Sequence, residues 1–273
     1  MSEHSNNLPG QDQEQPLISH LLEMRQRLMR VLLIVLLIFL SLFYFANDLY
    51  TYLSDPLTSL LPEGTSMIAT DVASPFFAPF KLTLVASIFL AMPVILHQVW
   101  GFIAPGLYQN EKRLAVPLLV SSIFLFYAGM AFAYYVVFPL MFGFFTSVVP
   151  VNVEIATDIS SYLNFVLKLF FAFGIVFEIP IATLLLIWTG AATADGLAQK
   201  RAYVLVGCFV LGMLLTPPDV ISQSLLAVPM WLLFEVGIIM GRIFVKKNKD
   251  EDDDELDDEF EDAMSEEETN NRD

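Results

Sequence analysis

Residues 29–46 read MRVLLIVLLIFLSLFYFA, an almost unbroken run of large apolar side chains. A helix of about 20 mostly apolar residues spans the hydrocarbon core of a bilayer, so this run predicts a first transmembrane helix from about Met29 to Ala46. Five further candidate spans follow along the chain: Leu82 to Trp100, Leu114 to Val137, Tyr162 to Trp188, Ala202 to Leu215 and Val220 to Gly241. The sequence therefore predicts an all-α membrane protein with six transmembrane helices.

The overall composition agrees with this prediction. The chain of 273 residues is 56% hydrophobic and contains 24 Phe, and its mean hydropathy is +0.61. A soluble domain of this size has too little interior to hide so much apolar surface. The single cysteine, Cys208, excludes an internal disulfide, and no Cys/His spacing predicts a metal site. The polar N-terminus does not read as a cleavable signal peptide.

Prolines, ionisable residues and short connections predict irregularities in the spans. Pro93 lies inside the second span, while Glu178 and Pro180 interrupt the fourth. The fifth span is short, and only residues 216–219 join it to the sixth. We therefore expect two short C-terminal spans, forming a hairpin that does not fill a normal bilayer.

Two segments between the spans are expected to form outer loops. Residues 47–80 contain four prolines, Pro56, Pro62, Pro75 and Pro79, and predict a long first loop. The apolar segment Pro139 to Val149 is too short to cross a membrane easily. We expect this second segment to lie in an outer loop at the interface.

The net charge of −16 is concentrated in the C-terminal tail, because residues 250–273 hold 15 acidic side chains and one basic side chain. A block of like charges with few apolar residues stays disordered and solvated. Three parts are therefore predicted: a disordered N-terminus (1–16), a membrane domain (17–244) and a basic, then acidic, disordered cytoplasmic tail (245–273). The tail either keeps the chain soluble or contacts a partner.

The basic side chains predict the orientation. They cluster before span one, between spans two and three, between spans four and five, and after span six: Arg25, Arg27, Arg30, Lys112, Arg113, Lys200, Arg201, Arg242, Lys246, Lys247 and Lys249. With six spans all of these clusters fall on one side, and the opposite loops hold only Lys81. Because cytoplasmic loops carry the excess of Lys and Arg, both termini are predicted to be cytoplasmic.

Ionisable groups at membrane depth are costly, so Glu178 requires an explanation. Its carboxyl group is protonated, paired or facing a water-filled cavity, and Pro180 frees a backbone carbonyl nearby. A structural hydrogen bond inside the bundle and a functional polar site both remain open. Lys168, in the same span, is explained by snorkelling toward the interface.

The sixth span carries several polar residues and a pair of glycines. Asp219 reads as an N-cap, and the amide of Gln223 can bond across to another helix, of this chain or of a partner. Glu235 has Arg242 as a candidate partner. The glycine pair of this span, Gly237 and Gly241, is a weak signal for close helix packing.

Two carboxylates lie in predicted cytoplasmic segments. Glu23 can pair with Arg27 one helical turn further on, and Glu111 lies beside the basic residues Lys112 and Arg113. Taken alone, these residues are explained by ordinary surface ion pairs. The chain contains no Walker A loop, dinucleotide fingerprint, zinc-protease motif or nucleophile elbow, so neither ATP hydrolysis nor catalysis is expected.

Several strings together resemble the TatC family, the core subunits of the twin-arginine protein translocase. They are SHLLEMRQRL (19–28), MIATDVASPF (67–76), FIAPGLY (102–108), EKR (111–113), FGIVFEIP (173–180) and LTPPD (215–219). The match runs in order from about Pro16 to Phe244, and the acidic tail lies outside it. The resemblance implies a bowl-shaped six-helix bundle in the cell inner membrane.

The family resemblance also implies a function. A TatC-type subunit is a signal-peptide receptor that exports folded proteins whose signal peptides carry paired arginines, with energy from the proton-motive force. The implied partners are single-span TatA-type and TatB-type subunits, precursor proteins, further copies of the chain and the lipid bilayer. No cofactor and no nucleic acid is expected.

Site residues follow from the resemblance position by position. Glu23 and Glu111 match the cytoplasmic carboxylates of the signal-peptide site, where each can pair with a guanidinium in bidentate geometry, and Arg25 and Arg113 would orient them. Glu178 matches the intramembrane glutamate on the concave side of the bowl. Two further positions, Asp219 and Gln223, match places where partner helices pack.

The residues also allow three rival functions. A secondary transporter would use Glu178 as an ion carrier, but such transporters often show broken helices in matching halves, and only one broken span carries a carboxylate. An intramembrane enzyme would need a nucleophile with a base, or metal ligands, at membrane depth. A purely structural scaffold would tolerate the loss of both Glu23 and Glu111.

Overall fold

The computed structural model describes residues 11–58, 67–103, 112–150, 156–216 and 219–243. These residues form helices and one isolated β-bridge, and they contain no strand. Expectations for Glu111, Pro62 and the C-terminal tail lie outside the described residues. The chain divides into two compact units, residues 1–124 with 145–167 and residues 125–144 with 168–273, and each is described by itself.

The first unit begins with a long helix. α1 runs from Gln11 to Leu42, a short 3₁₀ turn (η1, Phe43–Phe45) follows, and α2 runs from Ala46 to Thr58. The apolar stretch of this helix extends over Leu22–Ser54. α1 therefore starts inside the segment 1–16 for which disorder was expected, and the span is longer at both ends than the predicted one.

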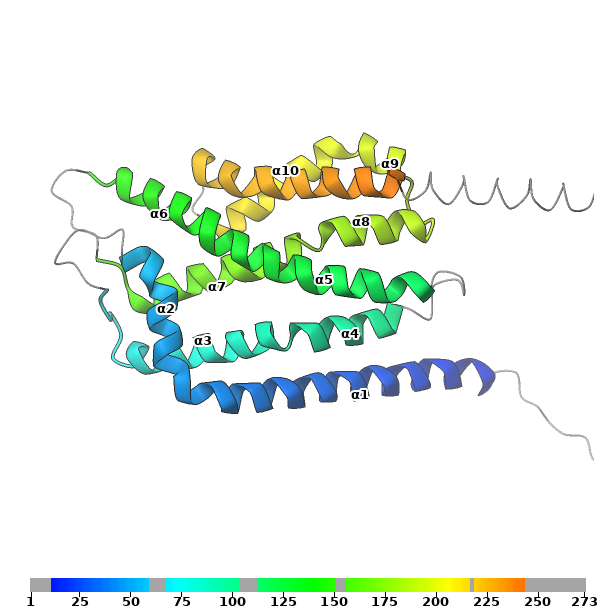
Figure 1. The fold of residues 1–273 in the computed structure, drawn as a ribbon, viewed down its shortest axis with the longest axis horizontal. Helices are drawn as coiled ribbons and strands as arrows, with labels where there is room; N and C mark the ends of the chain where they lie inside the picture. The colour runs from blue at the N-terminus through cyan, green and yellow to red at the C-terminus, as the bar shows by residue number, and fades with distance from the viewer. Residues whose placement is uncertain (1–10, 59–66, 104–111, 151–155, 217–218, 244–273) are drawn as a thin grey trace, which may run out of the picture. The chain divides into compact units, whose positions relative to one another are not determined.

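The second predicted span is a bent pair of helices. α3 (Ser74–Leu90) and α4 (Met92–Ile103) meet at Ala91 with a bend of 47°. Pro93 explains the bend, because it lacks an N–H and its ring disfavours a helical conformation for the residue before it. The expected loop 47–80 is wrong in part, since α2 and the first turns of α3 are helical. α1 packs along α3 and α4, and α2 contacts α3 (Figure 1).

A clasp of hydrogen bonds, formed by Thr70, Asp158 and Ser161, joins the segment before α3 to the start of α7 (Ile159–Val176). Asp158 Oδ1 accepts from the backbone N and the hydroxyl of Thr70, at 3.1 and 2.8 Å, and Oδ2 accepts from Ser161 N at 2.9 Å. The backbone N–H of Ile68 also donates to Thr157 O. The hydrogen bonds from Ser161 and Thr70 lower the pKa of Asp158 to about 2.

The clasp should depend on pH in a defined direction. The pKa of Asp158 is lower in the folded chain than in the unfolded chain. Its contribution to the free energy of unfolding is therefore fully present above the ordinary aspartate pKa of about 4. The contribution is lost as the pH falls through about 2. We expect Asp158→Asn to lower the thermal stability at neutral pH, with a difference that shrinks between about pH 4 and pH 2. Thermal unfolding of both proteins in detergent across this range measures it, and a difference independent of pH would contradict the assignment.

One helix, of which residues 125–144 belong to the second unit, lies where a loop was expected. α5 (Lys112–Phe132) continues through a π-helical turn (η4, Ala133–Val137) into α6 (Phe138–Ser147), and together they form one apolar helix over Val116–Ser147. The prediction that Pro139 to Val149 forms an outer loop is therefore wrong. Pro139 follows the π turn at the second position of α6, where its missing N–H is tolerated. Three apolar side chains of this segment are buried: Phe138, Met141 and Phe142.

Further helices, joined by short turns, make up most of the described residues in the rest of the second unit. α7 ends at Val176, and α8 (Ile179–Trp188) continues the span after a break at residues 177–178. α9 (Ala194–Gln199) and α10 (Arg201–Leu215) follow, and a last helix covers Val220–Ile243, here called the C-terminal helix. Pro180, at the start of α8, accounts for the break.

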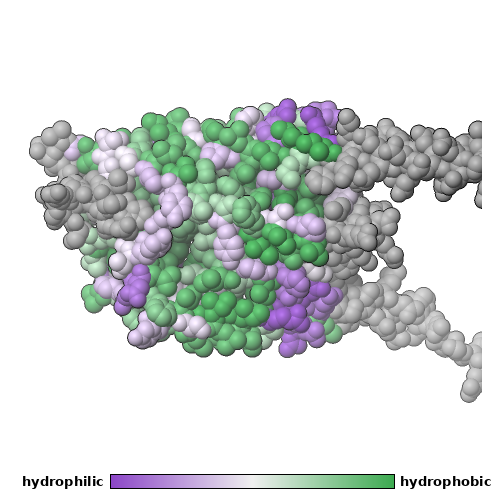
Figure 2. Space-filling model, in the orientation of Figure 1, coloured by the Kyte–Doolittle hydropathy of each residue, from purple (hydrophilic) through white to green (hydrophobic). Residues whose placement is uncertain are grey.

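Four described helices are long and apolar enough to cross a membrane, or five if α3 and α4 form one span. α10 is shorter, with 15 residues, whereas the C-terminal helix has 24. The expectation of two short C-terminal spans is therefore confirmed for α10 only, because 24 residues of helix at about 1.5 Å each exceed a hydrocarbon core of about 30 Å. Hydrophobic side chains dominate the coloured face in Figure 2, which suits contact with lipid.

Glycines allow the helices of the second unit to approach closely. A Cβ at Gly129 would lie 2.4 Å from the backbone O of Phe173, and one at Gly237 would lie 3.0 Å from Pro180 Cα. A Cβ at Gly241 would overlap the side chain of Ile187. The Gly237 and Gly241 pair therefore marks close helix packing, as its spacing indicates.

Candidate functional site

The first candidate site is the carboxylate of Glu23 on α1. Half of this side chain is exposed, and Oε1 accepts a hydrogen bond from Arg27 Nη2, one helical turn further on. Within the part of the chain that the structure describes, no hydrogen bond to Oε2 is found. The i, i+4 pair expected from the sequence is confirmed, and one carboxylate oxygen remains open to a cation.

Arg27 connects this carboxylate to α4. Its Nη1 donates to the backbone O of Gln98 at 2.9 Å, and Arg30 Nη1 lies 3.4 Å from Gln98 Oε1. No local pattern predicts these contacts, because residues 27 and 98 lie 71 positions apart. The interior glycine of α4, Gly101, is the one local feature that could have suggested a close approach.

The other predicted signal-peptide residues are only partly placed. The Arg25 side chain is exposed on α1. Glu111 lies outside the described residues. Arg113 belongs to the first turn of α5, and its side chain is likewise outside the description. That Glu23, Arg25, Glu111 and Arg113 form one signal-peptide site therefore stays a prediction.

The second candidate site is Glu178, in the break between α7 and α8. It lies at the N-cap position of α8, directly before Ile179 and Pro180. Its side chain is half-buried, and its backbone O accepts from Ala182 N at 2.9 Å. The break thus places a carboxyl group and irregular backbone at the same level of one span. The role of Glu178 as a polar site stays a prediction.

The third candidate site is the start of the C-terminal helix. Asp219 Oδ1 accepts from Ser222 N at 2.7 Å, which confirms the N-cap. Gln223 Nε2 donates to the backbone O of Phe209 on α10 at 3.0 Å. Its amide therefore bonds across to another helix of the same chain. Close packing at Gly212, where a Cβ would lie 3.2 Å from Gln223 Cγ, makes this approach possible.

An apolar groove lies beside this third site. It has a volume of about 500 Å³ and is bounded by the end of α5, the π turn and α6 on one side and by the C-terminal helix on the other. Val136, Leu140, Val220 and Val228 are among its lining residues. The one hydroxyl in its lining, on Ser224, donates to Val220 O, so the groove suits an apolar occupant.

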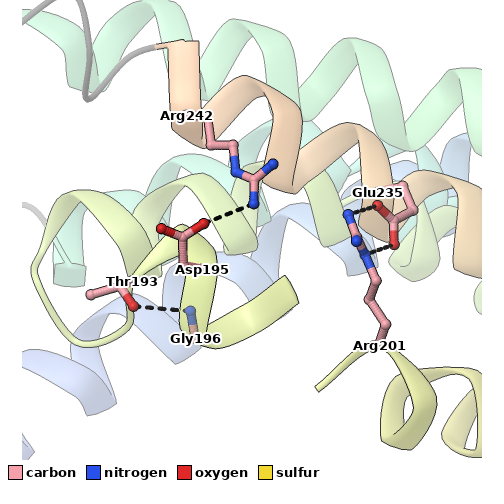
Figure 3. Close-up of polar contacts among 6 residues, drawn as sticks. All are labelled: Thr193, Asp195, Gly196, Arg201, Glu235 and Arg242. Carbon is pink, nitrogen blue, oxygen red and sulfur yellow. Dashed lines mark hydrogen bonds and ion pairs between the residues drawn. The ribbon is translucent and has the colours of Figure 1, made fainter. Parts of the chain in front are cut away.

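Two ion pairs connect the C-terminal helix to α9 and to the first residue of α10 (Figure 3). Arg201 binds Glu235 in bidentate geometry, with Nε to Oε1 at 2.6 Å and Nη2 to Oε2 at 2.7 Å. Arg242 Nη2 donates to Asp195 Oδ1 at 2.8 Å. The predicted partnership of Glu235 with Arg242 is therefore wrong, because both side chains reach partners on other elements.

The two pairs should differ in their effect on stability. Glu235 is only 16% exposed, whereas Asp195 is 84% exposed. Arg201→Ala leaves a largely buried carboxylate without its bidentate partner, so we expect a loss of about 1.5–3 kcal/mol in unfolding free energy. The control, Arg242→Ala, should cost less than about 1 kcal/mol. Thermal unfolding of both variants in detergent tests this, and equal losses would contradict it.

Comparison with known families identifies the chain. A family model described as "Sec-independent protein translocase protein (TatC)" matches residues 19–229. The chain belongs to the TatC family. The match begins within α1 and ends in the first half of the C-terminal helix, so it spans all three candidate regions described above.

Individual TatC relatives are similar over most of their length. The TatC of Azotobacter chroococcum mcd 1 is 66% identical over 233 residues, which cover 85% of this chain and 91% of the relative. The TatC of Escherichia coli K12 is 59% identical over 239 residues, with coverage of 88% and 93%. A crystal structure of the twin-arginine translocase receptor TatC superposes with a TM-score of 0.73 at 38% identity, covering 82% of this chain and 98% of the other. The observed helices are therefore those of a TatC fold.

Proposed function

We propose that this chain is the signal-peptide receptor and core component of a twin-arginine translocase, which exports folded proteins with energy from the proton-motive force. The observation that carries the proposal is the open Glu23 carboxylate on α1, in a chain of the TatC family. A guanidinium offers two parallel N–H donors to a carboxylate, whereas an ammonium cannot form the same fork. The site therefore favours Arg over Lys in the signal peptide.

The membrane arrangement belongs to the same proposal. The chain crosses the cell inner membrane six times, as a bowl-shaped bundle with both termini in the cytoplasm and a disordered tail at 245–273. Support comes from the clustering of Lys and Arg on one side of six spans. Glu23, Arg25, Glu111 and Arg113 then share the cytoplasmic side.

Partner subunits are proposed to bind within the membrane. Asp219 and Gln223 are sequence neighbours of Val220 and Ser224, which line the apolar groove described above, and this lining suits a single-span helix of the TatA or TatB type. Glu178 would serve as a polar spot that hydrates or thins the bilayer, or that contacts a partner helix. Copies of the chain associate in the working assembly.

Site-specific photocrosslinking tests the receptor function. Probes placed beside Glu23 and Glu111 are exposed in membranes to a labelled twin-arginine precursor, with a Lys-Lys precursor as the control. Crosslinks that disappear with Lys-Lys, and in Glu23→Ala or Glu111→Ala, would support the proposal. Absence of crosslinks, or crosslinks indifferent to the arginines, would contradict it and return attention to a transporter that uses Glu178.

A further inference from the structure

Arg27 lies between the Glu23 carboxylate and helix α4. One end of its guanidinium donates to Glu23 Oε1, and the other donates to the backbone O of Gln98. Only 20% of the Arg27 side chain is exposed, compared with 51% for Glu23. The Arg27 guanidinium, which is held by α4, therefore restrains the more exposed carboxylate of Glu23.

Gly101 provides the space for this arrangement. A Cβ at this position would lie 2.9 Å from Arg27 Nη1 and 3.6 Å from Cζ, so the guanidinium packs against the glycine itself. Gln98 and Gly101 lie in the last two turns of α4, where the helix dipole favours a positive charge. Both features fix the guanidinium independently of Glu23.

We propose that Arg27 is a positioning residue of the twin-arginine site, an inference that rests on the function proposed above. It holds Glu23 by Oε1 and leaves Oε2 directed to an incoming guanidinium. A free surface glutamate would lose rotamer freedom when a signal peptide binds, and a restrained one has already lost it. The positive charge of Arg27 acts in the opposite direction, since it repels a cationic peptide. Positioning and repulsion therefore predict opposite signs for the loss of Arg27.

The test measures the affinity of the full chain, in nanodiscs, for a fluorescent Arg-Arg signal peptide and for its Lys-Lys counterpart. We expect Arg27→Gln to weaken Arg-Arg binding by about two- to tenfold, the range for one newly immobilised side chain. Lys-Lys binding should change little, so the preference for Arg-Arg falls. The matched control, Arg30→Gln, removes the same charge from α1 at a residue that contacts the Gln98 side chain rather than Glu23, and it should keep the preference.

Two further variants separate positioning from a general structural effect. In a Glu23→Gln background, Arg27→Gln should cause no additional loss, because Arg27 acts through that carboxylate. Arg27→Lys keeps the charge but not the planar fork, and it should also weaken Arg-Arg binding. It serves as the test if the glutamine variant fails to fold.

Distinct outcomes would overturn distinct statements. Unchanged or tighter Arg-Arg binding in both Arg27 variants, an equal loss in Arg30→Gln, or a full extra loss in the Glu23→Gln background overturns the positioning role. A wild-type chain that binds both peptides equally overturns the receptor function itself.

Discussion

Glu23→Gln should weaken binding of a twin-arginine signal peptide by about ten- to hundredfold, the range expected when one hydrogen-bonded charged partner is lost. The amide keeps the size of the side chain but removes its charge and replaces one acceptor oxygen by a donor. Since half of the side chain is exposed, the folded state should change little in stability. The binding measurement therefore reports on recognition rather than on folding.

The control for this prediction is Asp195→Asn. Asp195 is 84% exposed and lies between spans four and five, on the same predicted cytoplasmic side as Glu23. Asp195→Asn therefore removes one negative charge from that side, as Glu23→Gln does. We expect peptide binding to stay within about twofold of wild type in this control, because the charge is screened by solvent. Equal weakening by the two variants would show that only net charge matters at this surface.

Gly129→Ala adds only one methyl group, and we expect it to destabilise the folded chain strongly. The added Cβ would lie 2.4 Å from the backbone O of Phe173 and 2.9 Å from its carbonyl carbon. Backbone atoms of a packed helix cannot move aside as a flexible side chain can, so α5 and α7 must separate within the second unit. We expect a loss of about 3 kcal/mol or more in unfolding free energy.

Gly207→Ala is the matched control. Nothing lies within 4 Å of a Cβ at this position on α10, so the same methyl group meets open space. Because Ala favours a helix more than Gly by about 1 kcal/mol, this variant should be as stable as wild type or slightly more stable. Thermal unfolding of both variants in one detergent measures the contrast, and comparable melting temperatures would show that the helices at Gly129 can separate freely.

Much of the helical architecture could be predicted from the sequence, because apolar runs and prolines act locally. The interruption at Pro180 follows from the chemistry of the proline ring. The same local rule failed at Pro139, where a π turn and the burial of Phe138 and Phe142 keep the segment helical. Tertiary packing decides such cases, and the periodicity of the sequence alone does not predict that packing.

The site could be predicted in part for a similar reason. The Glu23 and Arg27 pair depends only on helical spacing. The Gln98 contact and the Arg201–Glu235 pair join residues 71 and 34 positions apart, and they depend on which helices meet. The sequence suggests Arg242 as the ion-pair partner of Glu235 because both lie on one helix. Proximity along one helix cannot predict partners on other elements.

The π turn at Ala133–Val137 has a consequence for insertions and deletions in this chain. A π turn holds one residue more than an α turn, so removal of a single residue from it could restore regular α-helix. Because an α turn covers nearly the same angle and rise with one residue fewer, the segment after the deletion would keep its orientation, and Phe138 and Met141 would stay in the core. Straightening the turn into α-helix without a deletion would instead rotate this segment by about 100° around the helix axis. The extra residue in this short turn therefore sets the angular register of the segment that follows.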